Sequence, residues 1–287
     1  MSATTANTAN TTNTMRFGCC AQLPDADLVR AAGFDYLEPH VATVMKPEYE
    51  DDVLWEQAKS ELFDLAERGL PVEAMNVFLP RHLKVTGPDA SALQRELYTY
   101  VALAMYRMSE NGVRVVVFGS GGARSIPAGF ERTRAEDQLA AFLAHLERES
   151  AATGVAVVIE PLNLKESNIF TSVAESDQFA LSRGVPGIYV LADLYHMAQE
   201  GETYDGMRAA GPRLRHAHVA DVDRTPPGMG EVADYPGFFR TLREIGYAGT
   251  VSVECRWESD ADDRAARGAE YAAANQYLRR AWAASGA

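Results

Sequence analysis

The chain has 287 residues, enough to bury one large core, and its 47% hydrophobic and 23% charged residues are typical of a globular protein. Its formal net charge of −13, together with the lack of a basic stripe in the sequence, argues against a nucleic-acid partner. The sequence contains no apolar run long enough to span a bilayer, so we expect no membrane association.

Residues 1–14 carry no charged side chain and consist of Met, Ser, Thr, Asn and Ala. This segment has neither the basic start nor the apolar run of a signal peptide. We therefore expect a disordered tail ahead of a single folded domain over residues 15–287.

The three cysteines, Cys19, Cys20 and Cys255, form no spaced framework. Such a pattern indicates free thiols in a reducing compartment, and we expect the cytoplasm. The adjacent pair also lacks the two-residue gap of zinc knuckles, which argues against zinc ligation.

From residue 16 onward, short apolar runs alternate with segments of helical spacing. In the first half, the predicted strands cover residues 16–20, 35–37, 72–78 and 113–118. The predicted helices there cover residues 25–32, 52–68, 89–109 and 133–153. Thr133, with Glu136 three residues later, predicts a capping box at the start of the fourth helix.

The second half continues the same alternation. Its predicted strands cover residues 156–160, 187–193, 214–219 and 250–254. Its predicted helices cover residues 172–184, 204–210, 236–245 and 261–284. Ser172 and Glu175 form a second predicted capping box. Eight strand–helix units without a break in composition predict an α/β protein with a single (β/α)₈ barrel over residues 15–287.

A doubly wound open sheet is the alternative architecture, but it brings four strand ends to one point less easily. Within either fold, the glycine-rich segment 119–124 follows the fourth strand. It would offer backbone N–H groups and Arg124 to an anion such as a phosphate, or form a tight turn that makes room for a substrate.

Four predicted strands end on side chains that can bind a metal: Glu160, Asp193, His218 and Glu254. The carboxyl ends of barrel strands meet at one face, where catalytic groups lie. Each residue alone would more often form a salt bridge or cap a helix. Three carboxylates and one imidazole together suit Mn²⁺, Mg²⁺ or Co²⁺ better than structural zinc, so we predict a divalent-metal site.

Further polar residues follow these strands. His196 lies on the predicted loop after Asp193, Glu166 lies six residues after Glu160, and Arg224 lies in a proline-rich loop. We expect these three to gather around the predicted metal site. His216 joins them with a supporting or structural role. In the plainer interpretation, Arg224 is a surface charge and His196 a helix-end residue.

Four motifs carry a family resemblance. They are Glu160-Pro161-Leu162-Asn163 with Glu166, Asp193-Leu194-Tyr195-His196-Met197, His216-Ala217-His218 followed by Asp221 and Arg224-Thr225-Pro226-Pro227-Gly228, and Val253-Glu254. With them, nearly everything after Met15 resembles the xylose-isomerase-like (β/α)₈ barrel proteins. More narrowly, it resembles the sugar isomerase/epimerase group that contains the ketose 3-epimerases.

The resemblance implies that Glu160, Asp193, His218 and Glu254 hold one divalent ion, Mn²⁺ first and otherwise Co²⁺ or Mg²⁺. It also implies an enzyme acting on a ketose or related polyol ketone, whose hydroxyls and carbonyl would form hydrogen bonds with the substrate-binding residues His196, Glu166 and Arg224. The ion would stabilise the enediolate formed when the carbon beside the carbonyl loses its proton. Glu160 and Glu254 would act as the acid/base pair on opposite faces of that carbon. If one face both takes and returns the proton, aldose–ketose isomerisation results. The group also leads us to expect a homodimer or homotetramer.

Three other functions stay open. A lyase or dehydratase acting on a keto-sugar or ketocyclitol would use the same enediolate chemistry and lose water. An endonuclease IV-like nuclease would need more metal-binding histidines and a basic groove. A non-catalytic barrel would bind a small polyol or a partner subunit. Residues 220–223 read Ala-Asp-Val-Asp where Gly-Glu-Cys-Asn is typical of the free-ketose enzymes, which leaves the sugar and its phosphorylation undetermined.

Overall fold

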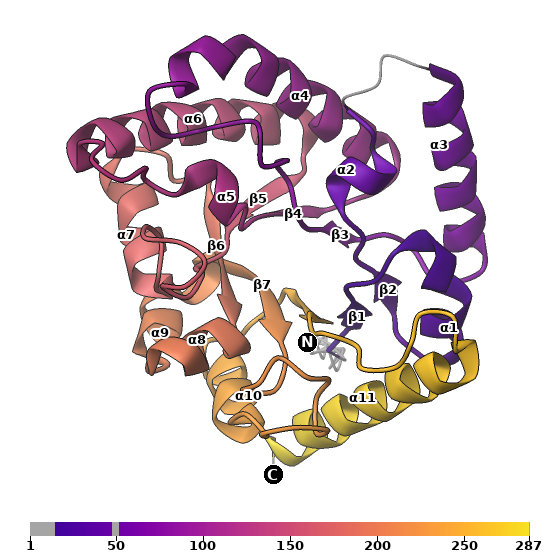
Figure 1. Cartoon of the computed structure of the whole chain (residues 1–287). Helices are drawn as coiled ribbons and strands as arrows, with labels where there is room; N and C mark the ends of the chain where they lie inside the picture. The colour runs from indigo at the N-terminus through magenta and orange to yellow at the C-terminus, as the bar shows by residue number, and fades with distance from the viewer. Residues whose placement is uncertain (1–14, 48–51, 287) are drawn as a thin grey trace, which may run out of the picture.

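The computed structural model describes residues 15–47 and 52–286, so the predicted tail over residues 1–14 lies outside the described residues. Eight parallel strands form one sheet in the order β2-β1-β8-β7-β6-β5-β4-β3. Isolated parallel bridges, Leu37 to Val72 and His40 to Asn76, complete the ring between β2 and β3. Figure 1 shows the helices around this barrel. The predicted (β/α)₈ barrel is confirmed, and the open-sheet alternative is wrong.

The strands are short and lie close to their predicted positions. They are β1 (Phe17–Cys19), β2 (Tyr36–Leu37), β3 (Ala74–Met75), β4 (Val115–Phe118), β5 (Ala156–Ile159), β6 (Tyr189–Asp193), β7 (Leu214–Val219) and β8 (Thr250–Val253).

Eight helices correspond to predicted ones. They are α1 (Ala26–Ala31), α3 (Asp52–Glu67), α4 (Ala90–Glu110), α6 (Arg132–Thr153), α7 (Val173–Ser182), α9 (Asp205–Ala210), α10 (Tyr235–Glu244) and α11 (Arg264–Ala284). Three short helices lie where the sequence predicts loops: α2 (Val41–Val44), α5 (Gly121–Arg124) and α8 (Leu194–Glu200). Each of these follows the carboxyl end of a strand, so they shape the face where the predicted site lies.

Alternation along the strands explains why the site residues face the barrel interior. Val158 of β5 belongs to a buried cluster with Val117 and Leu191, while its neighbours in the strand pack with the main core. Successive side chains of a strand point to opposite faces. Glu160, two residues after Val158, and Asp193, two after Leu191, therefore point to the same inner side as the cluster.

Two local predictions need correction. Helix α6 begins at Arg132, one residue before Thr133, and no side chain caps its first turn. Arg132 can start the helix because its guanidinium reaches Glu136 one turn later, at 2.8 Å. His196 lies in α8 rather than in a loop, because the Asp193 carboxylate caps a helix that starts directly after β6. By contrast, the second predicted cap is confirmed, since the Ser172 side chain accepts the N–H of Glu175.

Within the described ranges, no helix is both long enough and apolar enough to cross a membrane. Cys19, Cys20 and Cys255 are free thiols. This matches the prediction made from their spacing.

Candidate metal centre and active site

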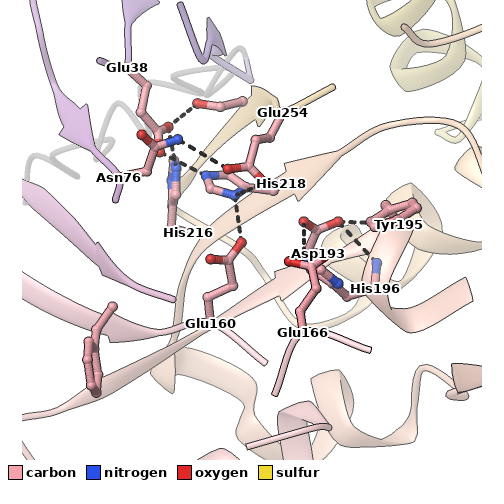
Figure 2. Close-up of polar contacts among 12 residues, drawn as sticks. Glu38, Asn76, Glu160, Glu166, Asp193, Tyr195, His196, His216, His218 and Glu254 are labelled. Atoms are coloured by element: carbon pink, nitrogen blue, oxygen red, sulfur yellow. Dashed lines mark hydrogen bonds and ion pairs between the residues drawn. The ribbon is translucent and has the colours of Figure 1, made fainter. Parts of the chain in front are cut away.

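Four side chains with metal-binding atoms meet at the carboxyl ends of four neighbouring strands (Figure 2). Glu160 follows β5, Asp193 ends β6, His218 lies in β7 and Glu254 follows β8. One ligand atom of each lies within 4.8 Å of the others. All four residues that the sequence predicts as ligands are therefore close together, because the strands that carry them are adjacent and parallel.

Asp193 provides a test of whether a cation fits. Its Oδ1 accepts the backbone N–H of Tyr195 at 2.7 Å, whereas its Oδ2 is buried and has no hydrogen-bond donor within the described residues. Burial and the charge of Glu254 raise the pKa of Asp193 to about 6. A buried acceptor without a partner is destabilising, and a divalent cation at this point would satisfy it. The donor set therefore fits a divalent metal ion.

The two glutamates of the cluster have different electrostatic surroundings. Burial and the charge of Glu254 raise the pKa of Glu160, although His218 lies 3.0 Å from its Oε1. Burial would also raise the pKa of Glu254, but His218 and Arg224 lower it below its usual value. Arg224 donates to Glu254 Oε2 at 3.2 Å, and Asn76 donates to Oε1 at 3.3 Å. Glu160 therefore holds a proton more readily than Glu254.

Glu38, directly after β2, is a residue that the sequence analysis did not assign to the site. Its side chain is fully buried, and each carboxylate oxygen contacts one histidine. Oε1 lies 2.8 Å from His218 Nε2, and Oε2 lies 2.8 Å from His216 Nε2. Ser252 donates a further hydrogen bond to Oε2. His216 also reaches Thr250 Oγ1 at 3.0 Å through Nδ1. Glu38 and His216 thus lie behind His218 and support it.

The sequence does contain a signal for Glu38. Glu38-Pro39 repeats the Glu160-Pro161 pattern, in which a carboxylate ends a strand and a proline stops the ladder. Burial would raise the pKa of Glu38, but His218 and His216 lower it well below its usual value. Glu38 is therefore an anion at neutral pH, and it accepts hydrogen bonds from both rings.

His196 is oriented by the segment that follows β5. Its Nδ1 lies 3.1 Å from the backbone N of Asn163, which donates to it. Burial lowers the pKa of His196, so the ring is neutral and carries its proton on Nε2. This Nε2 is buried without a hydrogen-bond acceptor in the described part of the chain, and it lies 3.8 Å from Asp193 Oδ2. The ring therefore offers a free hydrogen-bond donor beside the metal cluster, the group formed by Glu160, Asp193, His218 and Glu254 that could hold a metal ion.

Arg224 links the outer residues of the site. Its guanidinium donates to Glu166 at 2.9 Å and to Glu254 at 3.2 Å, and it lies over the Tyr195 ring at 4.8 Å from the centroid. Arg224 thus joins Glu166, one residue of the predicted group, to Glu254 of the cluster.

The loop that carries Arg224 is built around a buried aspartate. Asp221 Oδ2 accepts three backbone N–H groups from residues 228–230 at 2.9–3.0 Å, and Oδ1 accepts the Tyr235 hydroxyl at 2.8 Å. Arg224 itself has a left-handed backbone, with φ of 64°. Asp221 therefore closes the loop, and the closed loop directs the Arg224 side chain toward the site.

The glycine-rich segment after β4 makes room for Glu160. A Cβ atom on Gly119 would lie 2.1 Å from Glu160 Oε2. Arg124 is fully buried and donates to the carbonyl oxygens of Phe118 and Glu160 at 2.8 and 2.7 Å. The segment therefore acts as a tight turn, and its arginine is not available to an anion.

The chain matches the model of the xylose isomerase-like TIM barrel family over residues 26–280. The 3-dehydro-D-guloside 4-epimerase of Escherichia coli (strain K12) is 30% identical over 112 residues, which cover 39% of this chain and 42% of that protein. The match thus spans less than half of this relative.

A second relative matches along most of its length. The L-ribulose 3-epimerase of Methylomonas sp. (strain DH-1) is 26% identical over 259 residues, which cover 84% of this chain and 86% of that protein. The solved structure of D-psicose 3-epimerase from Clostridium cellulolyticum H10 with D-tagatose has a TM-score of 0.81 at 19% identity, covering 93% of this chain and 99% of that one. At this identity, the structural likeness supports the fold alone.

Proposed function

Because the chain belongs to the xylose isomerase-like TIM barrel family, we propose that it is a sugar epimerase or isomerase that depends on one divalent metal ion. The observation that carries the proposal is the convergence of Glu160, Asp193, His218 and Glu254 around a point that a buried, unpaired oxygen of Asp193 faces. Mn²⁺ is the ion we expect first, with Co²⁺ or Mg²⁺ as alternatives.

The relatives support a ketose or related polyol ketone as the substrate. The relative that matches along most of the chain is named an L-ribulose 3-epimerase, and the partial match is named a 3-dehydro-D-guloside 4-epimerase. Both names describe inversion at a carbon of a sugar that carries a carbonyl group. We propose the same class of reaction here.

The metal, when bound, would stabilise the negative charge that forms on the substrate oxygens as the carbon beside the carbonyl loses its proton. Glu254 is the carboxyl group that is deprotonated and so available to accept a proton, because His218 and Arg224 lower its pKa although burial would raise it. Glu160 is the better acid, because burial and Glu254 raise its pKa. We propose that the two exchange roles for the reverse reaction, one removing the proton and the other returning it.

The remaining side chains would orient the sugar. His196 offers its Nε2 proton, and Arg224 and Glu166 form an ion pair whose outer atoms can bond to hydroxyl groups. For His216 we propose the supporting role that the sequence analysis gives it. Because both of its ring nitrogens contact Glu38 and Thr250 inside the barrel, we propose that it orients Glu38 and does not bind the sugar.

Metal content and isotope exchange test the proposal. Elemental analysis of the wild type should find about one divalent ion per chain, and Glu254→Gln should contain less. Glu166→Gln, a control that removes a carboxylate outside the cluster, should keep the ion. Proton NMR in D₂O over a panel of ketoses should then detect deuterium at a carbon beside the carbonyl.

The same spectra separate the competing functions. A stereoisomer as product indicates an epimerase, an aldose indicates an isomerase, and loss of water indicates the lyase. A protein that binds no metal, or that binds metal but exchanges no proton on any ketose, would contradict the proposal. We also propose that the protein is a cytoplasmic homodimer or homotetramer. Light scattering of the purified protein tests the oligomeric state.

A further inference from the structure

A pocket of about 680 Å³ lies at the end of the barrel opposite the metal cluster. Its lining comes from residues near the amino-terminal ends of six strands, β1, β3, β4, β5, β7 and β8, from the turn between α10 and β8, and from Arg243 of α10 and Trp282 of α11. Its charged side chains are Arg16, Glu73, Arg114, Arg215 and Arg243. The volume is that of an ordinary small-molecule site.

The charge of this pocket is opposite to that of the chain. The chain has 40 acidic and 27 basic residues, whereas the pocket lining has four arginines and one glutamate. The glutamate, Glu73, is already paired with Arg16 at 2.7 Å. In the part of the chain that the structure describes, neither Arg114 nor Arg215 forms an ion pair with a carboxylate. The pocket therefore concentrates positive charge that the protein itself does not neutralise.

Aromatic rings and backbone groups hold two of the guanidinium groups in place. Arg243 lies 3.8 Å from the centroid of the Trp282 ring and donates to the Trp282 carbonyl at 2.9 Å and to Ser285 Oγ at 3.0 Å. Arg215 lies 4.4 Å from the centroid of the Tyr189 ring. Stacked guanidinium groups lose less side-chain freedom when they bind a ligand. The pocket is thus partly organised before any anion enters.

We propose that this pocket binds a small phosphorylated metabolite with at least two phosphate groups. The arginine fork matches the oxygens of a phosphate in a bidentate way, and several arginines around one space favour more than one anionic group. Sugar bisphosphates and nucleoside diphosphates share this chemistry. Since the pocket lies at the far end of the strands from Glu160 and Glu254, the anion would not compete with the sugar, and the proposal does not depend on the proposed function.

Isothermal titration calorimetry on the intact protein tests the site with two probes. Glucose 1,6-bisphosphate has no free carbonyl and stands for the sugar bisphosphates, and ADP stands for the nucleotides. We expect one-to-one binding of at least one probe at low salt, and the tighter probe identifies the class. Raising the ionic strength should weaken binding, because the contacts are electrostatic.

Two double variants give the decisive comparison. Arg114→Gln/Arg215→Gln should weaken binding about tenfold or more, since it removes two charge-assisted contacts. Arg95→Gln/Arg280→Gln removes the same charge from exposed helical positions that do not line the pocket and should bind like the wild type. Arg114→Lys/Arg215→Lys keeps the charge and covers the case in which Arg114→Gln/Arg215→Gln fails to fold. Its affinity for the probe should lie between those of the two glutamine variants.

Three results would overturn the proposal. The first is that the wild type binds neither probe with a dissociation constant below about 10 mM, because weaker binding has no meaning for a metabolite site. The second is that both arginine-to-glutamine variants weaken binding equally, which indicates a general charge effect. The third is that binding survives unchanged in the pocket variants, which would place the anion at the metal cluster.

Discussion

His218 lies between two carboxylates, with Nε2 2.8 Å from Glu38 Oε1 and Nδ1 3.0 Å from Glu160 Oε1. A carboxylate anion only accepts hydrogen bonds, so Nε2 must carry a hydrogen. The remaining nitrogen, Nδ1, is then the atom that can give its lone pair to a cation. Carboxylates that hold metal-binding histidines in this way orient the ring and raise its basicity.

This geometry predicts that Glu38→Gln weakens metal binding by about tenfold to a hundredfold. The amide carries no charge and can present an N–H group to His218 or His216 in place of an acceptor. Competition with a chromogenic chelator measures the dissociation constant. Glu73→Gln is the matched control, because Glu73 lies at the other end of the barrel and binds Arg16. Unchanged metal affinity in Glu38→Gln would refute the orienting role.

Protonation of the cluster predicts that metal affinity depends on pH. Burial and Glu254 raise the pKa of Asp193 to about 6, so without metal this carboxyl binds a proton below that pH. Burial would lower the pKa of His218, but Glu38 and the groups around it raise it well above its usual value. Both groups must lose a proton to bind a cation.

Metal affinity should therefore rise steadily as the pH increases from 5 to 8. Calorimetry in two buffers of different ionisation enthalpy should show that protons are released on binding. An affinity that stays constant across this range would mean that neither group exchanges a proton with the metal.

At the scale of elements, the loops after β4 and β7 position the site. The loop after β7 needs Asp221, which accepts three backbone N–H groups from residues 228–230. Asp221→Asn replaces one acceptor oxygen with a donor and should raise the Michaelis constant about tenfold, because Arg224 loses its fixed position. Metal content should be unchanged.

Asp223→Asn is the control for this loop, since the Asp223 side chain is exposed and accepts hydrogen bonds from the backbone N and the Oγ1 of Thr225. Equal effects of the two substitutions on the Michaelis constant would indicate general loosening of the loop and exclude a specific role of Asp221.

A substitution in the loop after β4 tests whether Gly119 makes room for the Glu160 carboxylate. Gly119→Ala should displace the Glu160 carboxylate, because the new Cβ would lie 2.1 Å from Glu160 Oε2. We expect metal binding weaker by at least about tenfold, with a melting temperature of the metal-free protein within a few degrees of the wild type. Gly268→Ala, in α11, meets only Leu28 at 3.5 Å and should leave metal binding unaffected. Normal metal binding in Gly119→Ala would show that the turn accommodates a Cβ atom at this position without displacing the Glu160 carboxylate.

At the scale of the whole molecule, the cluster joins four strands from the second half of the barrel. A ligand that binds only the folded protein stabilises it, by about 2.7 kcal/mol at a hundred times its dissociation constant. For a barrel of this size, that corresponds to a rise of about 5–10 °C in the melting temperature. Differential scanning fluorimetry with added Mn²⁺ or EDTA should detect this difference in the wild type but only a smaller one in Glu254→Gln. A metal effect of equal size in both would place the ion elsewhere.

Much of the architecture follows from local patterns in the sequence. The short apolar runs place all eight strands, and the helical spacings place eight of the helices to within a few residues. Three helices at the carboxyl ends were missed, because α2 and α5 have only four residues each and α8 starts directly after β6 with no intervening loop. His196, a residue of the proposed site, is the one affected, since it lies in α8.

The barrel and the strand-end positions of Glu160, Asp193, His218 and Glu254 can be predicted from the sequence, because strand alternation and strand-end position are properties of a few neighbouring residues. What surrounds these four residues depends on the tertiary structure. Glu38 meets His216 and His218 across separations of 178 and 180 residues, and Arg224 meets Glu166 across 58. The four arginines of the opposite pocket likewise come from segments between Arg16 and Arg243. Such pairings depend on how the closed sheet brings distant strand ends together, which no local pattern encodes.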